Sequence, residues 1–350
     1  MRKAIFLPTI IAALFAVTSC IPSPAMKEVK EARSGRALNG RVCVVYSYRY
    51  QVQLGGLENL HTFDINKYAK IYRRMVSDRL LQPDDVFVPE PISRGDLLRV
   101  HTTEYLDRRL TRPAALAQYL EFGPAKLAPS GLTDSAVLRP FRYATGGTLL
   151  AARLALHYGI AINLGGGYHH AEPDRGGGFC IYADMPVAIR ALRAEGLINR
   201  ALIVDLDVHQ GNGTAVCLRG DDSVFTFDMH EADIYPVPKK ANDLDVPLPA
   251  GTGDAEYLAL LAEKLPAVFE QACPDIVFLQ AGVDVLQGDS LAHLDMTVEG
   301  AVKRDVMVFE EANRRGIPIV MVLGGGYSKM AWYAQYRSIR EVLVRYGGCM

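Results

Sequence analysis

One short segment of the sequence alternates acidic and imidazole side chains with apolar ones. Residues 205–209 read Asp-Leu-Asp-Val-His, so strand geometry would place Asp205, Asp207 and His209 on one face. A carboxylate and an imidazole two residues apart can bind one metal ion. Catalytic zinc takes three protein ligands and keeps one position open, and Asp284, which follows another apolar run, is the natural third ligand.

These acids could instead form a solvated turn. However, they directly follow a buried apolar run, where a carboxylate is costly unless it is paired or binds a cation. The position of Asp205 and Asp207 therefore favours a metal site.

Two adjacent histidines, His169 and His170, follow three glycines. Glycine lets the backbone turn sharply and approach a ligand closely. A lone histidine is more often a packed core residue, but two in succession, in a chain with 8 histidines, favour proton transfer. We expect His170 to be the general base, and Asp205 either to orient one of the histidines or to bind a monovalent cation.

Tyr327 follows a second glycine run, residues 324–326. A phenol on such a loop can donate a hydrogen bond to an oxyanion without carrying a charge of its own. The run could also be interpreted as a phosphate cradle. It lacks the lysine and hydroxyl of a P-loop, and no GxGxxG follows the first strand, so nucleotide binding is not favoured.

Each of these groups follows a short apolar run rich in β-branched residues, and a helical stretch comes after each run. These runs are residues 160–164, 201–206, 275–281 and 317–323, and residues 42–46 form a further expected strand. Helices are expected at residues 66–81, with Lys and Arg on the outer face, and at residues 144–158. Buried runs alternating with helices predict a single-domain α/β fold, a parallel sheet with helices on both faces. Ligands bind such sheets beyond the carboxyl ends of the strands.

Composition excludes some classes of partner and site. The net charge is −1, so the chain has no basic field of the kind that binds nucleic acid through its phosphates. Without CxxC pairs, the cysteines beyond residue 20 predict neither a disulfide framework nor a structural zinc knuckle. Most of them are expected to be small buried hydrophobes: Cys43, Cys180, Cys217, Cys273 and Cys349.

The first twenty residues are typical of an export signal, with a basic start, an apolar stretch too short to cross a bilayer, and small residues before Cys20. They resemble a bacterial lipoprotein signal, in which that cysteine is acylated; an ordinary secretory signal or an uncleaved anchor are the alternatives. We expect 1–20 to be the signal, 21–40 a tether and 41–350 the folded domain. The protein would be anchored at the periplasmic side of a membrane, or else be periplasmic or secreted.

From about Tyr46 to its end, the chain resembles the histone deacetylase family, with the arginase/deacetylase fold, and within that family class IV. Five motifs carry the resemblance: TGGT at 145–148, GGGFCIYAD at 176–184, DLDVHQGNG at 205–213, AGVD at 281–284 and VKRD at 302–305. The resemblance implies zinc ligands at Asp207, His209 and Asp284, a dyad of His169 and His170, Tyr327 polarising the acyl carbonyl, and a substrate tunnel lined by Gly178, Phe179 and Tyr235.

Asn212 stands where most deacetylases have an acid that holds the second histidine, and class IV members share this asparagine. A neutral amide stabilises an imidazolium less than a carboxylate does, so His170 should be less basic than in an acid-backed dyad.

The function expected from these residues is zinc-dependent hydrolysis that removes acetyl or longer acyl groups from lysine side chains. An acetylpolyamine amidohydrolase of the same fold is one alternative, and an exported zinc-binding protein without turnover is another, although no expected ligand, histidine or tyrosine is missing. An arginase-like enzyme would want a second-metal carboxylate four residues after Asp207, where this chain has Gly211.

Overall fold

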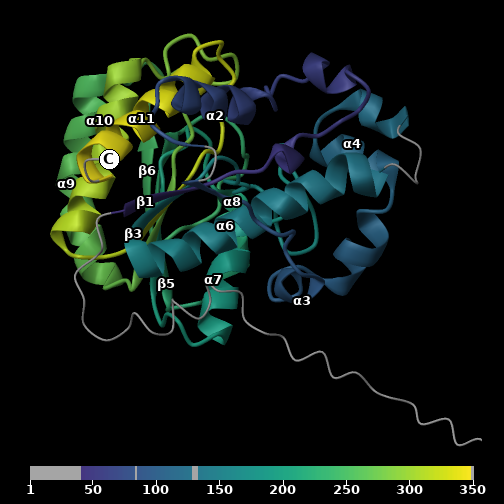
Figure 1. Ribbon diagram of the computed structural model, residues 1–350, viewed down its shortest axis with the longest axis horizontal. Helices are drawn as coiled ribbons and strands as arrows, with labels where there is room; N and C mark the ends of the chain where they lie inside the picture. The colour runs from purple at the N-terminus through teal and green to yellow at the C-terminus, as the bar shows by residue number, and fades with distance from the viewer. Residues whose placement is uncertain (1–40, 83–84, 128–132, 348–350) are drawn as a thin grey trace, which may run out of the picture.

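The computed structural model describes residues 41–82, 85–127 and 133–347 (Figure 1). The expected signal and tether, together with Cys20 and Cys349, lie outside the described residues. The domain boundary near residue 41 therefore stays a prediction.

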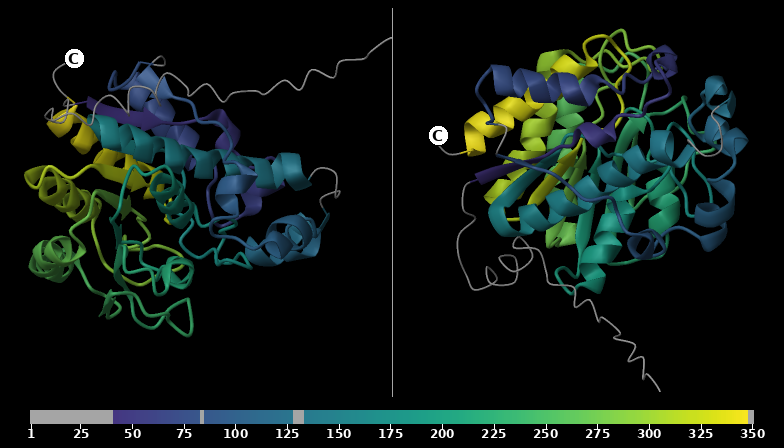
Figure 2. Two further views of the ribbon diagram at one scale, coloured as in Figure 1. Left: turned by 90° about the horizontal axis from the view of Figure 1, so that it is seen from below. Right: turned by 45° about the vertical axis from the view of Figure 1, so that its right-hand side comes forward.

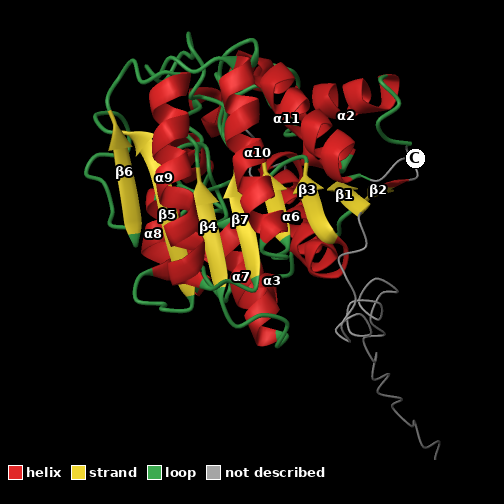
Figure 3. Ribbon diagram, turned by 90° about the vertical axis from the view of Figure 1, so that its left-hand side faces the viewer, coloured by secondary structure: helices red, strands yellow, loops and turns green. Residues whose placement is uncertain are grey.

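Eight strands pair in parallel to form one sheet, in the order β2-β1-β3-β8-β7-β4-β5-β6 (Figure 3). Every residue of the four central strands is buried. The predicted α/β class is thus confirmed. The strands are β1 Arg41–Val45, β2 Val86–Phe87, β3 Gly159–Asn163, β4 Ala201–Asp205, β5 Val224–Glu231, β6 Leu244–Leu248, β7 Ile276–Gln280 and β8 Ile319–Val322.

Helices cover both faces of the sheet (Figure 3). On one face α2 (Lys67–Ser77), α9 (Asp254–Ala272), α10 (Val298–Arg314) and α11 (Ala331–Tyr346) pack in series, and on the other α6 (Arg139–Tyr158) packs on α7 (Asp184–Ala194). Short helices α3 (Arg94–Leu97) and α4 (Pro113–Tyr119) lie beyond α6 and α7 (Figure 2), and α8 spans Asn212–Leu218. The remaining helical turns are η1 Tyr48–Tyr50, η2 Leu57–Leu60, η4 Tyr105–Arg109, η5 Gly123–Leu127 and η6 Asp134–Leu138.

The strands expected from apolar runs are confirmed to within two residues at each end. Strands β2, β5 and β6 were not predicted, and β2 has only two residues. β5 interrupts its apolar pattern with Thr226, Asp228 and His230, and β6 is an edge strand that contains Pro247, a residue disfavoured inside a sheet.

The sequence suggested that the Lys and Arg residues of α2 all lie on its outer face. One of them does not. Lys70, Arg73 and Arg74 are exposed, but Lys67 is only 1% exposed and points toward the glycine run at residues 324–326. The helix ends at Ser77, short of the predicted residue 81, because Arg79 adopts a left-handed φ of 57°.

Four cysteines fall in the described part of the chain, and none of them forms a disulfide bond there. Three are buried as expected and Cys273 is exposed. None of the helices in residues 41–82, 85–127 and 133–347 combines the length and apolar character needed to cross a bilayer.

The topology places the chemical motifs side by side. Strands β3, β8, β7 and β4 are neighbours in the sheet, and the segments after them carry the histidine pair, Tyr327, Asp284 and residues 205–209, respectively. Because all four strands run parallel, these segments meet at one edge of the sheet, where ligands of such folds bind.

Candidate functional site

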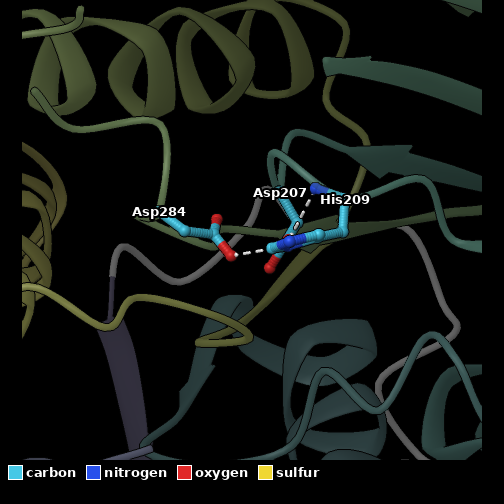
Figure 4. Close-up of side chains that lie close together, drawn as sticks. All are labelled: Asp207, His209 and Asp284. Atoms are coloured by element: carbon cyan, nitrogen blue, oxygen red, sulfur yellow. Dashed lines mark hydrogen bonds and ion pairs between the residues drawn. The ribbon is translucent and has the colours of Figure 1, made fainter. Parts of the chain in front are cut away.

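Three of the predicted residues converge on one point at this edge (Figure 4). The ligand atoms of Asp207, His209 and Asp284 all lie within 4.8 Å of one another. His209 Nδ1 is 3.1 Å from Asp284 Oδ2 and 3.4 Å from Asp207 Oδ1. All three side chains are buried. We call these three residues the metal group.

Backbone amides hold the two carboxylates in place. The Gly325 N–H donates to Asp207 Oδ2 at 2.7 Å, and the Val208 N–H donates to Asp284 Oδ1 at 3.1 Å. A Cβ atom at Gly325 would overlap the Asp284 carboxylate, so only glycine allows the backbone to approach this closely. Each carboxylate is thereby fixed with its other oxygen toward His209.

The metal group fits a divalent cation. Two buried carboxylates beside one imidazole are costly without a positive charge. Burial alone would lower the pKa of His209, but the Asp207 and Asp284 carboxylates raise it to about 10, so these two acids favour positive charge beside them. Two carboxylates and one imidazole are also a donor set that suits zinc, with a position left open for substrate or water.

A second cluster within the described residues, Asp228, His230 and Asp245, also has its ligand atoms within 4.8 Å of one another. Its atoms are already hydrogen-bonded: Asp228 accepts from the Gly211 N–H at 2.8 Å and lies 2.7 Å from His230 Nδ1, and Asp245 accepts from Gln210 Nε2 at 2.8 Å. This cluster ties the loop after β4 to β5 and β6.

The two histidines are supported differently. His169 Nδ1 lies 2.9 Å from Asp205 Oδ2, a direct contact with a carboxylate. His170 Nδ1 lies 2.7 Å from Asn212 Oδ1, a contact with a neutral amide. The imidazole centroids are 4.0 Å apart. The structure thus places Asp205 as an orienting partner of His169, one of the two roles expected for it, and Asn212 behind His170.

The pKa values of the two histidines are shifted in opposite directions. Burial would lower the pKa of His169, but the Asp205 and Asp207 carboxylates raise it to about 9. Burial, together with the positive charges of His169 and His209, lowers the pKa of His170 well below its ordinary value. The Asn212 hydrogen bond itself raises this pKa, so burial and the two positive neighbours lower it, and the expected effect of an amide in place of an acid stays a prediction. At neutral pH His170 is the imidazole able to accept a proton.

An apolar pocket leads to the histidines. Phe179, Gly178 and Tyr327 line it, whereas Tyr235 does not; its ring instead packs edge-on against His170 with centroids 4.9 Å apart. The rest of the lining includes many apolar and aromatic side chains: Tyr50, Val52, Leu54, Phe63, Ile65, Tyr68, Leu120, Phe122, Phe141 and Tyr168.

Residues 178 and 179 both adopt the left-handed backbone conformation. A Cβ atom at Gly178 would overlap the His170 imidazole, so glycine is required there. Phe179 has φ 65°, which is strained for a bulky side chain and is found mostly where function demands it. This backbone directs the Phe179 ring to within 5.7 Å of the Tyr327 ring, centroid to centroid.

Tyr327 is held by a residue that the sequence analysis missed. Asp289 Oδ2 accepts from the backbone N–H groups of Tyr327 and Ser328, at 2.8 and 2.9 Å. The Tyr327 ring centroid lies 6.1 Å from that of His209. Burial and the Asp284 and Asp207 carboxylates raise the pKa of Tyr327 well above its ordinary value, so its hydroxyl stays a donor.

Two buried cations, whose roles the sequence analysis did not foresee, bind backbone carbonyls around the metal group. Lys67 Nζ donates to the Gly324 and Gly325 carbonyls at 2.7 and 3.1 Å, and burial lowers its pKa to about 8. Arg304 Nη1 donates to the Leu206 and Gly282 carbonyls at 2.8 and 2.9 Å.

Arg304 therefore links the loops after β4 and β7, which carry the metal group. Its Nε and Nη2 atoms donate to Asp305 Oδ1 at 2.9 and 2.7 Å, and both side chains are fully buried. The sequence showed this pair only as part of the VKRD motif; a charged pair on the apolar face of a helix was the available signal.

We predict that Arg304→Met lowers the free energy of unfolding by about 3–5 kcal/mol, because it leaves the Asp305 carboxylate buried without a partner. Metal affinity should fall roughly 10–100-fold as the two loops lose their link. Urea unfolding and competition with a chromophoric chelator measure the two effects. In the control, Arg304→Met with Asp305→Leu, stability should recover while metal affinity stays low; wild-type affinity in both variants would contradict this role.

Comparisons with known proteins agree with this geometry. A family model described as histone deacetylase domain matches residues 61–343. Histone deacetylase 2 of Arabidopsis thaliana is 39% identical over 325 residues, covering 89% of this chain and 84% of that protein. Two solved structures share the fold. The HDA15 HD domain superposes with a TM-score of 0.71 at 22% sequence identity, covering 88% of this chain and 90% of that one. Acetylpolyamine aminohydrolase from Burkholderia pseudomallei superposes with a TM-score of 0.67 at 19% sequence identity, covering 85% of this chain and 97% of that one.

Proposed function

The chain belongs to the histone deacetylase family, and from this premise we propose that it is a zinc-dependent hydrolase that removes acyl groups from lysine side chains. One observation carries the proposal. The metal group, the low-pKa imidazole of His170 and the phenol of Tyr327 meet at one strand edge, beside an apolar pocket that both His170 and Tyr327 line.

The residues divide the chemistry of amide hydrolysis among them. Zinc bound to the metal group would supply a Lewis acid for the acyl carbonyl and the attacking water. His170 accepts the proton of that water and later returns it to the leaving amine. The Tyr327 hydroxyl donates a hydrogen bond to the developing oxyanion, and His169, kept positive by Asp205, stabilises the same negative charge.

The acyl group that fits this pocket is acetyl or longer. Its lining of aromatic and aliphatic side chains offers apolar contact well beyond the two carbons of acetate. We assign the chain to a class IV-like subgroup because of its five motifs and Asn212. Hydrolysis of an acetylpolyamine at the same site is the alternative, favoured by the fold shared with the Burkholderia aminohydrolase.

A panel of acyl-lysine peptides of increasing chain length, together with acetylpolyamines, tests the substrate class. We expect chelator-sensitive release of the acyl group from the peptides. We also propose that a monovalent cation binds beside Asp205, in addition to the contact of this acid with His169, so the rate should drop in tetramethylammonium buffer relative to potassium. Release from polyamines alone would select the alternative, and no chelator-sensitive release from any substrate would leave a zinc-binding protein without turnover.

Two variants separate metal binding from catalysis. His209→Ala should abolish both zinc binding and activity, because it removes one of three ligands. Tyr327→Phe should retain zinc and lower kcat roughly 100–1000-fold, the usual loss for one oxyanion donor. Zinc content by elemental analysis and steady-state kinetics give the comparison; undiminished kcat in Tyr327→Phe would remove this residue from the mechanism.

We also propose that the protein is exported and anchored through an acylated Cys20 at the periplasmic side of a membrane. The support is the pattern of the first twenty residues alone. An exported site would meet acylated peptides or amines, and the near-neutral net charge gives no reason to expect nucleic acid. Cys20→Ala should move the protein from the membrane fraction to the soluble one; retention in the membrane would exclude lipidation as the anchor.

A further inference from the structure

A buried chain of hydrogen bonds continues behind His170. Asn212, whose Oδ1 contacts His170 Nδ1, donates from its Nδ2 to Glu172 Oε1 at 3.2 Å. Arg175 Nη2 donates to the same Glu172 oxygen at 2.6 Å. Glu172 is 7% exposed and Asn212 6% exposed, whereas the Arg175 side chain is largely in solvent. The Glu172 carboxylate thus lies behind His170, with the Asn212 amide between them.

The backbone of Glu172 is fixed on both sides. Its N–H donates to the Arg175 carbonyl at 2.9 Å, and its carbonyl lies 3.1 Å from His101 Nδ1. His101 Nε2 accepts from the Ala183 N–H at 3.0 Å, so the Nδ1 atom must carry the hydrogen. Glu172 is therefore a rigid acceptor rather than a mobile surface acid.

The direction of each bond follows from Glu172. A carboxylate oxygen only accepts, so the amide atom of Asn212 that faces it is the NH2 group. The amide oxygen of Asn212 then faces His170, and because it also only accepts, His170 Nδ1 must be the protonated nitrogen. In the neutral imidazole, Nε2 is left with a free lone pair.

We propose that Glu172 is a positioning residue for His170. By fixing the orientation of the Asn212 amide, it holds the imidazole in the Nδ1–H tautomer and leaves Nε2 free to take a proton. An unheld amide could rotate, present its NH2 group to His170 and force the opposite tautomer. The catalytic consequence rests on the proposed function, in which His170 is the general base; the tautomer itself does not.

The other groups around His170 do not select this tautomer. They lie on the segments after β3, β4 and β5, whereas within the described part of the chain only Asn212 forms a hydrogen bond with the Nδ1 atom of the ring. These neighbours are His169, His209, Asp207, Cys180 and Tyr235.

Three variants test the role of Glu172. Glu172→Met removes the acceptor and should lower kcat roughly 10–100-fold with unchanged KM and zinc content. Glu172→Gln keeps an acceptor oxygen for Asn212 and should restore most of the turnover. Arg175→Met is the matched control: it breaks the same ion pair but leaves the Glu172 oxygen, so kcat should stay near the wild-type value. Equal losses in Glu172→Met and Arg175→Met would reduce Glu172 to a surface ion pair.

The tautomer is measured directly by NMR of zinc-loaded protein labelled with 15N-histidine, with His170→Gln to assign the signals. We expect a protonated Nδ1 for His170 in the wild type and Glu172→Gln, and a loss of that preference in Glu172→Met. A wild-type His170 protonated at Nε2, or an unchanged signal in Glu172→Met, would overturn the proposal. A wild type that hydrolyses no acyl substrate would defeat the proposed function while leaving this measurement decisive.

Discussion

The site depends on negative charge buried at the ends of parallel strands. Burial and the neighbouring Asp207 carboxylate raise the pKa of Asp284 to about 6, so the two acids resist being ionised together. A bound cation removes this conflict by stabilising both carboxylates in their ionised form. The surrounding backbone stabilises the ionised acids: the Gly325 N–H donates to Asp207 and the Val208 N–H donates to Asp284.

The buried cations Lys67 and Arg304 bind backbone carbonyls and not the carboxylates of the metal group. Lys67 and Arg304 both direct their donors at loop carbonyls, and Arg304 has its own partner in Asp305. The carboxylates of the metal group thus remain available as ligands while the loops that carry them are held in position. Hydrogen bonds that position the ligands without touching the metal commonly have a large effect on the affinity of a metal site.

The central strands and the residues after them were predictable, because buried β-branched runs and clustered acids leave local signals in the sequence. Contacts between distant segments leave none: Lys67 meets Gly324 across 257 positions, and Glu172 meets Asn212 across 40. Residue types identified Asn212 beside His170 but not what sets the pKa of this histidine. Burial and the positive neighbours His169 and His209 lower it against the Asn212 hydrogen bond, and neither this burial nor the carboxylate behind the amide could be read from the sequence.

The segment from His170 to Cys180 serves two purposes at once. Its first half places Glu172 behind Asn212, its second half presents Phe179 to the pocket, and two short bridges, Glu172 to Arg175 and Gly177 to Cys180, set its shape. Gly178 returns the chain to lie against the His170 ring. One inserted or deleted residue here would disturb the base and the acyl pocket together. The length of this loop is thus constrained as tightly as its composition, and relatives that alter one function of the loop must rebuild the other.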